Sequence, residues 1–232
     1  MAHLRQHADE FEAELKQAVS LGTTIMAASF DGGVVLGADS RTSTGNYVAN
    51  RVTDKLTPLC ENVYVCRSGS AADTQNMAAY VQYYLQQHRM ELDREVSVSV
   101  AANLAKQLVY NNKNMLQAGL IVAGFDKKEG GSVFALPLGG TLLQVPFAIG
   151  GSGSAYIYGF CDKFWRPNMS AEEAKKFVVQ AVSHAMARDG SSGGCIRTVV
   201  ITKDGVRRDF VPGSNVPQHY GELGAQYATA MA

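Results

Sequence analysis

The chain has no excess of charge of either sign, because 21 lysine and arginine side chains balance 21 aspartate and glutamate side chains. A neutral chain exerts little long-range attraction on a polyanion, so we expect neither nucleic acid nor an anionic membrane surface as a partner. Long apolar runs are also missing, since none approaches the roughly 20 residues that a membrane-spanning helix needs. These absences favour a globular protein that forms its own core.

Cysteine is scarce, and its positions form no recognisable motif. The sequence has no CxxC pair and no cluster of cysteine and histidine at metal-ligand spacing. A chain of 232 residues can bury a sufficient core without disulfide bonds. We therefore expect reduced, mostly buried thiols, no metal or organic cofactor, and a location in the cytoplasm and nucleus. The thiols belong to Cys60, Cys66, Cys161 and Cys195.

The first 22 residues have no apolar core of the kind found in secretory signals, and they carry several acidic side chains. This composition argues against both secretory and mitochondrial targeting. We interpret residues 1–22 as a polar leader, because β-rich sequence begins immediately after it, at Thr23. Residues 23–232 are expected to form a single domain with a polar, weakly patterned tail from about residue 213.

Short β-rich runs separated by glycine-rich turns predict most of the strands. Asp31-Gly32-Gly33 is a turn signal that makes a hairpin of the first two runs. The segments between residues 120 and 149 are expected to form a second antiparallel sheet. The predicted strands cover residues 24–30, 34–38, 63–66, 120–125, 132–138, 141–149 and 196–202.

Apolar residues at helical spacing predict two helices in the middle of the chain and one near its end. Capping boxes at Ser70/Asp73 and Ser170/Glu173 mark two of the starts, and a short helix is expected through Tyr158. The inward positions are Met77, Tyr80, Val81, Tyr84 and Leu85, then Val100, Ala101, Leu104, Ala105 and Leu108, and finally Ala174, Phe177, Val178, Ala181 and Ala185. This order of elements predicts an α+β fold, a four-layer αββα sandwich of two antiparallel sheets between helical layers.

Thr23 is a candidate nucleophile for a chemical reason. A threonine hydroxyl needs a base, and an N-terminal residue carries one in its own α-amine, whose ordinary pKa is about 7.7 to 8.0. In this chain Thr23 follows an amide, so it is masked until the bond after Gly22 is cut. Glycine leaves that carbonyl unshielded, which favours attack by Thr23 in cis. Taken alone, however, Thr23-Thr24 is better explained as the start of a strand, where β-branched residues are favoured.

Several further motifs accompany this threonine in the same order along the chain. They are LGTTIM at 21–26, GGVVLGADSR at 32–41, DK at 54–55, SGSA at 68–71, GGSGS at 150–154 and RDGSSGG at 188–194. Together they closely resemble the catalytic beta-type subunits of the 20S proteasome, from about Gly22 to about Pro212. The resemblance implies an N-terminal-nucleophile hydrolase fold, autocatalytic cleavage between Gly22 and Thr23, and a threonine endopeptidase.

The resemblance also implies roles for individual residues. Thr23 supplies the nucleophile and its amine, Lys55 an essential cation, and Asp39 the carboxylate partner of that cation. The N–H of Gly69 binds the developing oxyanion. The group around the terminal amine consists of Ser152, Asp189 and Ser192. Taken singly, Lys55 is better explained as a solvated surface lysine and Ser152 as a turn residue, and Asp39 is equally typical of an ordinary aspartate after a strand.

Arg67 is the residue that bears on specificity. A guanidinium at the base of a pocket binds a carboxylate through paired, charge-assisted hydrogen bonds. In the resembled family an arginine here accompanies the caspase-like, post-acidic subunit of eukaryotes, so we expect cleavage after acidic residues. The other expected pocket positions are Thr42, Thr53, Ala71 and Gln75.

Two alternatives remain within the same fold: a non-catalytic ring subunit and the simpler bacterial threonine protease. The first typically lacks the Gly-Thr junction or the lysine, and the longer leader and the extension beyond Gly205 disfavour the second. The expected partners are other alpha and beta subunits in stacked seven-membered rings, and unfolded polypeptide substrates.

One competing motif is rejected. Gly190-x-Ser192-x-Gly194 matches a hydrolase nucleophile elbow, but that elbow follows a strand and opens a helix, and here the order is reversed. His184 and His219 are interpreted as packing and surface residues.

Overall fold

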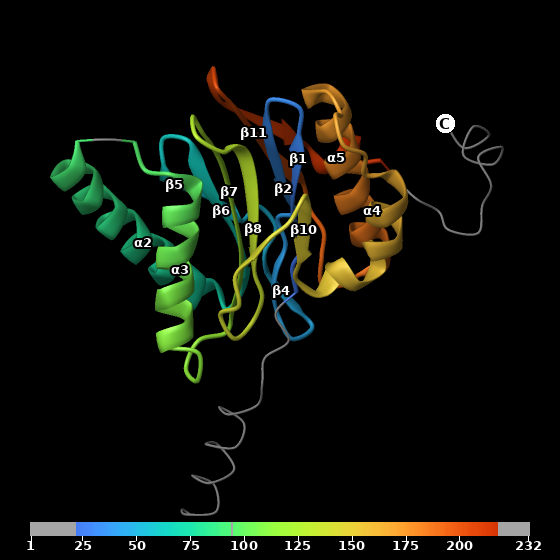
Figure 1. The fold of residues 1–232 in the computed structure, drawn as a ribbon. Helices are drawn as coiled ribbons and strands as arrows, with labels where there is room; N and C mark the ends of the chain where they lie inside the picture. The colour runs from blue at the N-terminus through green and yellow to red at the C-terminus, as the bar shows by residue number, and fades with distance from the viewer. Residues whose placement is uncertain (1–21, 94, 218–232) are drawn as a thin grey trace, which may run out of the picture.

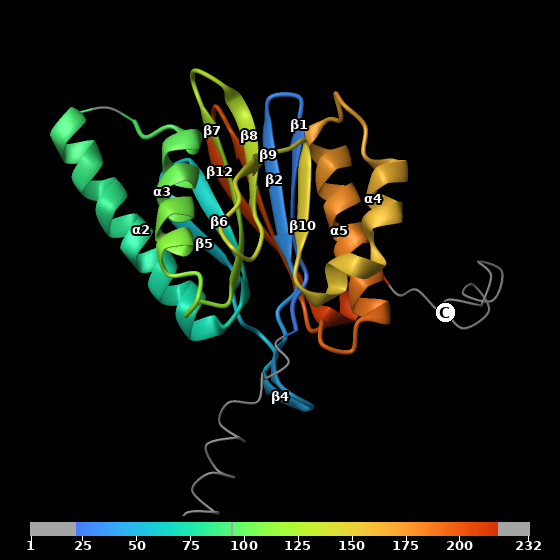
Figure 2. The same ribbon diagram turned by 60° about the horizontal axis from the view of Figure 1, so that its bottom comes forward.

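The computed structural model describes residues 22–93 and 95–217, in which two five-stranded antiparallel sheets lie face to face (Figure 1). The first sheet, in spatial order, consists of β10 (Phe147–Gly150), β1 (Ile25–Phe30), β2 (Gly33–Ala38), β11 (Ile196–Thr202) and β12 (Gly205–Val211). The second consists of β5 (Leu56–Cys60), β6 (Val63–Gly69), β7 (Ala118–Asp126), β8 (Gly130–Leu136) and β9 (Leu143–Gln144). A small hairpin of β3 (Thr42–Thr44) and β4 (Tyr47–Asn50) projects from one end, as Figure 2 shows.

Helices cover the outer faces of both sheets. α2 (Ala71–Leu92) and α3 (Val98–Asn111) lie on the second sheet, and α4 (Tyr158–Phe164) and α5 (Ala171–Arg188) lie on the first (Figure 1). Two short 3₁₀ turns, η1 (Ser152–Tyr156) and η2 (Gly213–Asn215), complete the described elements. The predicted α+β class and the two antiparallel sheets are confirmed. Within the described residues, no helix combines the length and the apolar composition needed to cross a membrane.

Three apolar clusters hold these layers together. The central one lies between the sheets and contains fully buried Ile25, Leu36 and Ile201. The outer two join each helical layer to its sheet, with Val81 and Leu85 of α2 in one and Phe177 of α5 in the other. Burial of these side chains, at about 25 cal/mol per Å² of apolar surface, is the main force that keeps the sheet ends in register around the site.

Both helices with predicted capping boxes start where expected, but only one box is complete. At α5 the Ser170 side chain accepts from the Glu173 N–H, and the Glu173 carboxylate accepts in return. At α2 the Ser70 hydroxyl accepts from the Asp73 N–H, whereas the Asp73 carboxylate accepts from the N–H of Gln117. Asp73 therefore ties the helix start to the segment before β7 instead of closing the box.

The predicted strand over residues 141–149 is wrong as a single element. Its two halves are β9, which pairs with β8, and β10, which pairs with β1 in the other sheet. Pro146 lies between them and has no N–H to continue a ladder, so the chain changes sheets there.

The predicted inward face of α2 is too wide. Met77, Val81 and Leu85 are buried, but Tyr80 and Tyr84 are 58% and 44% exposed. The i, i+3, i+4 stripe therefore overestimates the part of this helix that a flat sheet can cover. Val100 of α3, also predicted to point inward, is exposed as well.

Most of the predicted leader, and the tail from residue 218, lie outside the described residues. Gly22 is described and buried. Cys66, Cys161 and Cys195 are buried as predicted, and Cys60 is half-buried.

Candidate active site

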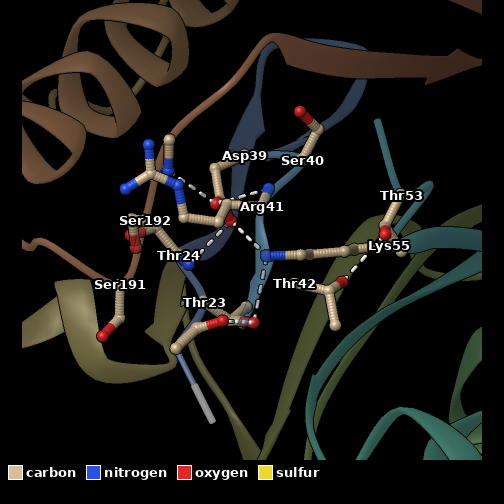
Figure 3. A network of polar contacts seen from close by, with 12 residues as sticks. Thr23, Thr24, Asp39, Ser40, Arg41, Thr42, Thr53, Lys55, Ser191 and Ser192 are labelled. Carbon is tan, nitrogen blue, oxygen red and sulfur yellow. Dashed lines mark hydrogen bonds and ion pairs between the residues drawn. The ribbon is translucent and has the colours of Figure 1, made fainter. Parts of the chain in front are cut away.

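Thr23 lies just before β1 with only 6% of its surface exposed, and its hydroxyl lies between two polar partners. Lys55 Nζ donates to Thr23 Oγ1 at 3.0 Å, and Thr23 Oγ1 donates to the carbonyl oxygen of Gly22 at 2.6 Å. Figure 3 shows the lysine side chain extended toward this hydroxyl. The residue predicted as the nucleophile therefore touches both the predicted cation and the carbonyl oxygen of Gly22.

Asp39, directly after β2, holds the other side of the lysine. Lys55 Nζ lies 2.6 Å from Asp39 Oδ1, and both side chains are almost fully buried. The carboxylate is fixed by main-chain donors, because its oxygens also accept from the N–H groups of Thr24 at 2.9 Å, Arg41 at 3.1 Å and Gly193 at 3.0 Å. A buried ion pair is favourable only when its remaining hydrogen-bonding capacity is filled, and here the carboxylate meets that condition.

Burial has the largest effect on the lysine. It lowers the pKa of Lys55 below the ordinary value, while the charge and hydrogen bond of Asp39 oppose this shift. A lysine whose proton is held less tightly, 3.0 Å from a hydroxyl, is suited to exchanging a proton with it. The arrangement can therefore stabilise a developing alkoxide on Thr23 and take part in moving its proton.

A second polar group surrounds the nitrogen of Thr23. This nitrogen donates to Ser152 Oγ at 3.1 Å, and Ser152 Oγ donates to Asp189 Oδ2 at 2.7 Å. Ser192 Oγ donates to the same carboxylate oxygen at 2.6 Å. Ser152 opens η1 and Asp189 caps the end of α5, so two helical elements bring these side chains to the nitrogen. The structure thus brings together all three residues that the sequence assigned to this group.

Gly69 ends β6 beside Thr23, with φ +102°. A Cβ at this position would lie 2.1 Å from the carbonyl oxygen of Gln117. Both the left-handed conformation and the close approach require glycine.

A cavity of about 30 Å³ opens next to Thr23. Its lining includes Thr42, Thr53 and Ala71 among the predicted pocket residues, together with Thr23, Lys55 and Arg67. Thr42 and Thr53 are linked by a hydroxyl–hydroxyl bond of 2.8 Å. Gln75, also predicted to line the pocket, is exposed on α2 and is not part of the lining. Its place is taken by Thr74, because the helix turns the preceding residue toward the cavity.

Arg67 is a buried cation with neutral partners. Its guanidinium donates to Thr57 Oγ1 at 2.8 Å, Thr74 Oγ1 at 3.3 Å and the Asp54 carbonyl at 2.7 Å. No carboxylate in the described part of the chain lies within ion-pair distance of it. Burial lowers the pKa of Arg67, yet a guanidinium keeps its charge in proteins. The cavity therefore presents a positive charge that has no ion-pair partner among the described residues.

Some contributors were not predicted from the sequence. Thr74 and Ser43 line the small cavity, and Arg41 donates to Asp39 through its main chain and to Gly190 through its side chain. Thr24, which has the sequence pattern of an ordinary strand residue, contacts both the Asp39 carboxylate and the Ser192 hydroxyl. A larger cavity, about 650 Å³, borders Gly69 and Ser152. Motif spacing gives no signal for these residues, because each acts through a fold contact with a segment distant in sequence.

The rejected hydrolase elbow lies between α5 and β11, with its serine bonded to Asp189 instead of a histidine. His184 packs against the ring of Phe160, with ring centres 4.8 Å apart, in agreement with its interpretation as a packing residue. His219 lies outside the described residues. Over residues 22–93 and 95–217, no three His, Cys, Asp or Glu side chains are grouped so that they could hold a metal ion.

Comparison with known proteins agrees with this geometry. Residues 19–201 match the family model described as "Proteasome subunit". "Proteasome subunit beta type-6" of Arabidopsis thaliana is 59% identical over 89% of this chain and 89% of that protein. "Proteasome subunit beta type-1" of Saccharomyces cerevisiae is 54% identical, covering 83% of this chain and 89% of that protein, and "Proteasome subunit beta type-9" of Homo sapiens is 50% identical, covering 88% and 93%. The chain belongs to the proteasome subunit family, among its beta type-6 and type-1 subunits.

Proposed function

We propose that this chain is a threonine endopeptidase subunit of the proteasome, with an N-terminal-nucleophile hydrolase fold of four αββα layers, which activates itself by cutting between Gly22 and Thr23. The observation that carries the proposal is the position of Thr23 Oγ1, 2.6 Å from the Gly22 carbonyl oxygen and 3.0 Å from Lys55 Nζ. A hydroxyl that contacts both the carbonyl group of the bond to be cut and a buried cation lies next to the two groups that the proposed attack involves.

These contacts support the following steps for self-processing. Thr23 Oγ attacks the carbonyl carbon of Gly22, the bond from that carbon to the Thr23 nitrogen breaks, and the hydroxyl proton ends on the nitrogen. The leader is then held as an ester, which water cleaves to a leader carboxylate and a free hydroxyl. The product is a chain whose first residue carries the amine that the reaction on substrates needs.

Peptide cleavage uses the same atoms. The free amine of Thr23, held by Ser152, takes the hydroxyl proton, and the Lys55 cation stabilises the alkoxide while Asp39 holds the lysine in place. Attack on a substrate carbonyl gives an oxyanion that the Gly69 N–H binds. The departing peptide takes a proton from the amine, and water then hydrolyses the acyl-enzyme. No metal or organic cofactor is needed for either step.

The cavity beside Thr23 supports a specificity for acidic side chains. A substrate carboxylate that enters it supplies the counter-ion that Arg67 lacks, and charge-assisted hydrogen bonds to guanidinium are among the strongest in proteins. Cleavage after acidic residues, the caspase-like activity, is the preference that this charge supports. Thr42, Thr53 and Ala71 form the walls of the pocket.

Function requires the rest of the particle. We propose that the chain assembles with other alpha and beta subunits in stacked seven-membered rings, in the cytoplasm and nucleus, and acts there on unfolded polypeptides in ubiquitin-linked degradation. A non-catalytic ring subunit is the alternative. It gives no reason for a buried lysine to contact a threonine hydroxyl that faces its own preceding carbonyl.

Particles assembled with the wild-type chain, Thr23→Ala and Thr23→Ser test the proposal. Intact mass should show a wild-type chain that starts at Thr23. The serine variant should also start at residue 23, but the processed chain should form more slowly, and the alanine variant should keep its leader. Cleavage after acidic residues should be fastest in wild type, slower in the serine variant and absent in the alanine variant. Wild-type chains in assembled particles that still begin at Met1 would contradict self-processing.

A further inference from the structure

A chain of hydroxyl groups extends beyond the residues assigned above. Ser152 Oγ and Ser192 Oγ both lie on Asp189 Oδ2, at 2.7 and 2.6 Å. Thr24 Oγ1 in turn lies 2.7 Å from Ser192 Oγ. The network that begins at the nitrogen of Thr23 therefore ends at the side chain of the next residue along the chain.

Counting protons fixes the direction of the last bond. A serine hydroxyl has one proton, and the Asp189 carboxylate can only accept, so Ser192 donates its proton to Asp189. The bond between the hydroxyls of Thr24 and Ser192 must then be donated by Thr24. The Thr24 proton therefore polarises Ser192 toward Asp189, and the bond that Ser192 donates to Asp189 Oδ2 competes with the bond that Ser152 donates to the same oxygen.

Thr24 also touches the opposite side of the site. Its N–H donates at 2.9 Å to Asp39 Oδ1, the oxygen that lies 2.6 Å from Lys55 Nζ. The residue is fully buried, and a Cβ on Gly153 would lie 1.9 Å from Thr24 Oγ1. The missing side chain at Gly153 thus makes the space that the threonine hydroxyl occupies.

We infer that Thr24 is a positioning residue for the terminal amine, which acts through Ser192, Asp189 and Ser152 to set how tightly the Thr23 nitrogen holds a proton. The inference rests on the proposed function, because it concerns the amine that self-processing creates. Other charges face the same region and remain in place: Asp39 and Arg41 after β2, Lys55 before β5, and Arg67 of β6. Thr24 differs from these groups because it can be changed without altering any charge.

The sign of the effect follows from the bond directions. Without the Thr24 hydroxyl, Ser192 donates a weaker hydrogen bond to Asp189 Oδ2, and Ser152, which shares that oxygen, donates a stronger one. Ser152 Oγ then becomes a better acceptor for the Thr23 nitrogen. The ammonium form of the Thr23 amine is then favoured, and its pKa rises. Since the reaction needs the free amine, activity should fall at low pH and recover at high pH. Loss of one hydroxyl–hydroxyl bond next to the charged partner should change the activity at low pH by about two- to threefold, which is a shift of about 0.3–0.5 pH unit in the acid limb.

The experiment uses assembled particles whose chains are made as fusions cut by a separate protease, so that every variant begins at Thr23 without processing itself. Thr24→Val keeps the β-branched shape, Thr24→Ala removes the hydroxyl without burying a new methyl, and Thr24→Ser keeps the hydroxyl. The measurement is kcat/KM for a peptide with aspartate before the bond across the titration of an α-amine, about pH 6 to 9. Particles with Thr23→Ala supply the background.

We expect the acid limb to move up in both hydroxyl-free variants and to stay at the wild-type position in Thr24→Ser. A uniform loss at every pH, or an unshifted limb in an active valine or alanine variant, would overturn the inference and leave the proposed function intact. In a Ser192→Ala background, Thr24→Val should add no further shift, and a full second shift would show that Thr24 acts by another route. Absence of activity in the wild-type particle would instead refute the proposed function.

Discussion

Replacement of Arg67 by methionine gives the sharpest test of specificity. Methionine approximates the length of the arginine side chain but removes its charge and all its donors. Two peptides that differ only in aspartate or asparagine before the scissile bond have nearly the same shape, so their kcat/KM ratio isolates the charge of the substrate side chain. A hydrogen bond to a charged group contributes about 1.5–3 kcal/mol, which predicts an aspartate preference of about 10- to 150-fold in the wild-type particle.

The variant should reduce that ratio to near one, mainly through loss of the aspartate peptide. It also removes the donor from Thr57, Thr74 and the Asp54 carbonyl, and an unsatisfied buried acceptor costs about 1–3 kcal/mol. Assembly and thermal stability must therefore be measured alongside activity. Because the ratio is taken within one particle preparation, a lower fraction of folded subunit does not change it.

Arg41→Met is the matched control. Arg41 also donates to a carbonyl, that of Gly190, but it does not line the cavity. The control should lower stability or overall rate without changing the ratio between the two peptides. If Arg67→Met kept a tenfold or larger preference for aspartate, the guanidinium would not be the group that selects acidic side chains.

Two further substitutions probe the site. Lys55→Met leaves Asp39 buried without its counter-ion, so we expect the leader to be retained, as measured by intact mass, and the unfolding free energy to fall by about 3–5 kcal/mol. Adding Asp39→Asn to this variant should restore stability but not processing. Restored processing in the double variant would exclude the lysine from the reaction. Gly69→Ala forces a side chain onto the Gln117 carbonyl at positive φ, with an expected loss of about 1–3 kcal/mol and of peptide cleavage. Gly159→Ala, whose added methyl meets nothing within 4 Å, should leave both measurements unchanged.

The sequence predicted best those features that depend on local pattern. The spacing of a few neighbouring residues is enough to predict three features. These are the start of a strand near Thr23, the complete capping box at Ser170 and the buried stripe of α5. Edge strand β12 was not predicted, because its half-exposed GVRRDFV sequence lacks the apolar alternation of a strand that faces a core. The division at Pro146 was missed because strand propensity does not indicate which sheet a segment joins.

The polar site also contains residues that the sequence predicted and residues that it did not. Family resemblance led to the residues that carry the proposed reaction, but nothing in the sequence distinguished Thr24 from any other β-branched residue at a strand start. Its importance depends on contacts 15 and 168 positions away, to Asp39 after β2 and to Ser192 between α5 and β11, which only the folded chain creates. Gln75 and Thr74 are neighbours in the sequence, and helix phase alone decides which of them reaches the cavity.

Strand register also explains why the site can survive the cut that is proposed to activate it. β1 pairs with β2 from Ile25 opposite Ala38, and with β10 from Ile25 opposite Gly150, so the ladders begin two residues after Thr23. Cleavage after Gly22 therefore breaks no ladder hydrogen bond. Asp39 stays opposite Thr24 because its N–H donates to the Thr24 carbonyl at 3.1 Å, and Gly153 still donates to the Thr23 carbonyl at 3.2 Å. The contacts that hold the new amine are thus in place before the bond is cut, which is the preorganisation that nucleophilic catalysis needs.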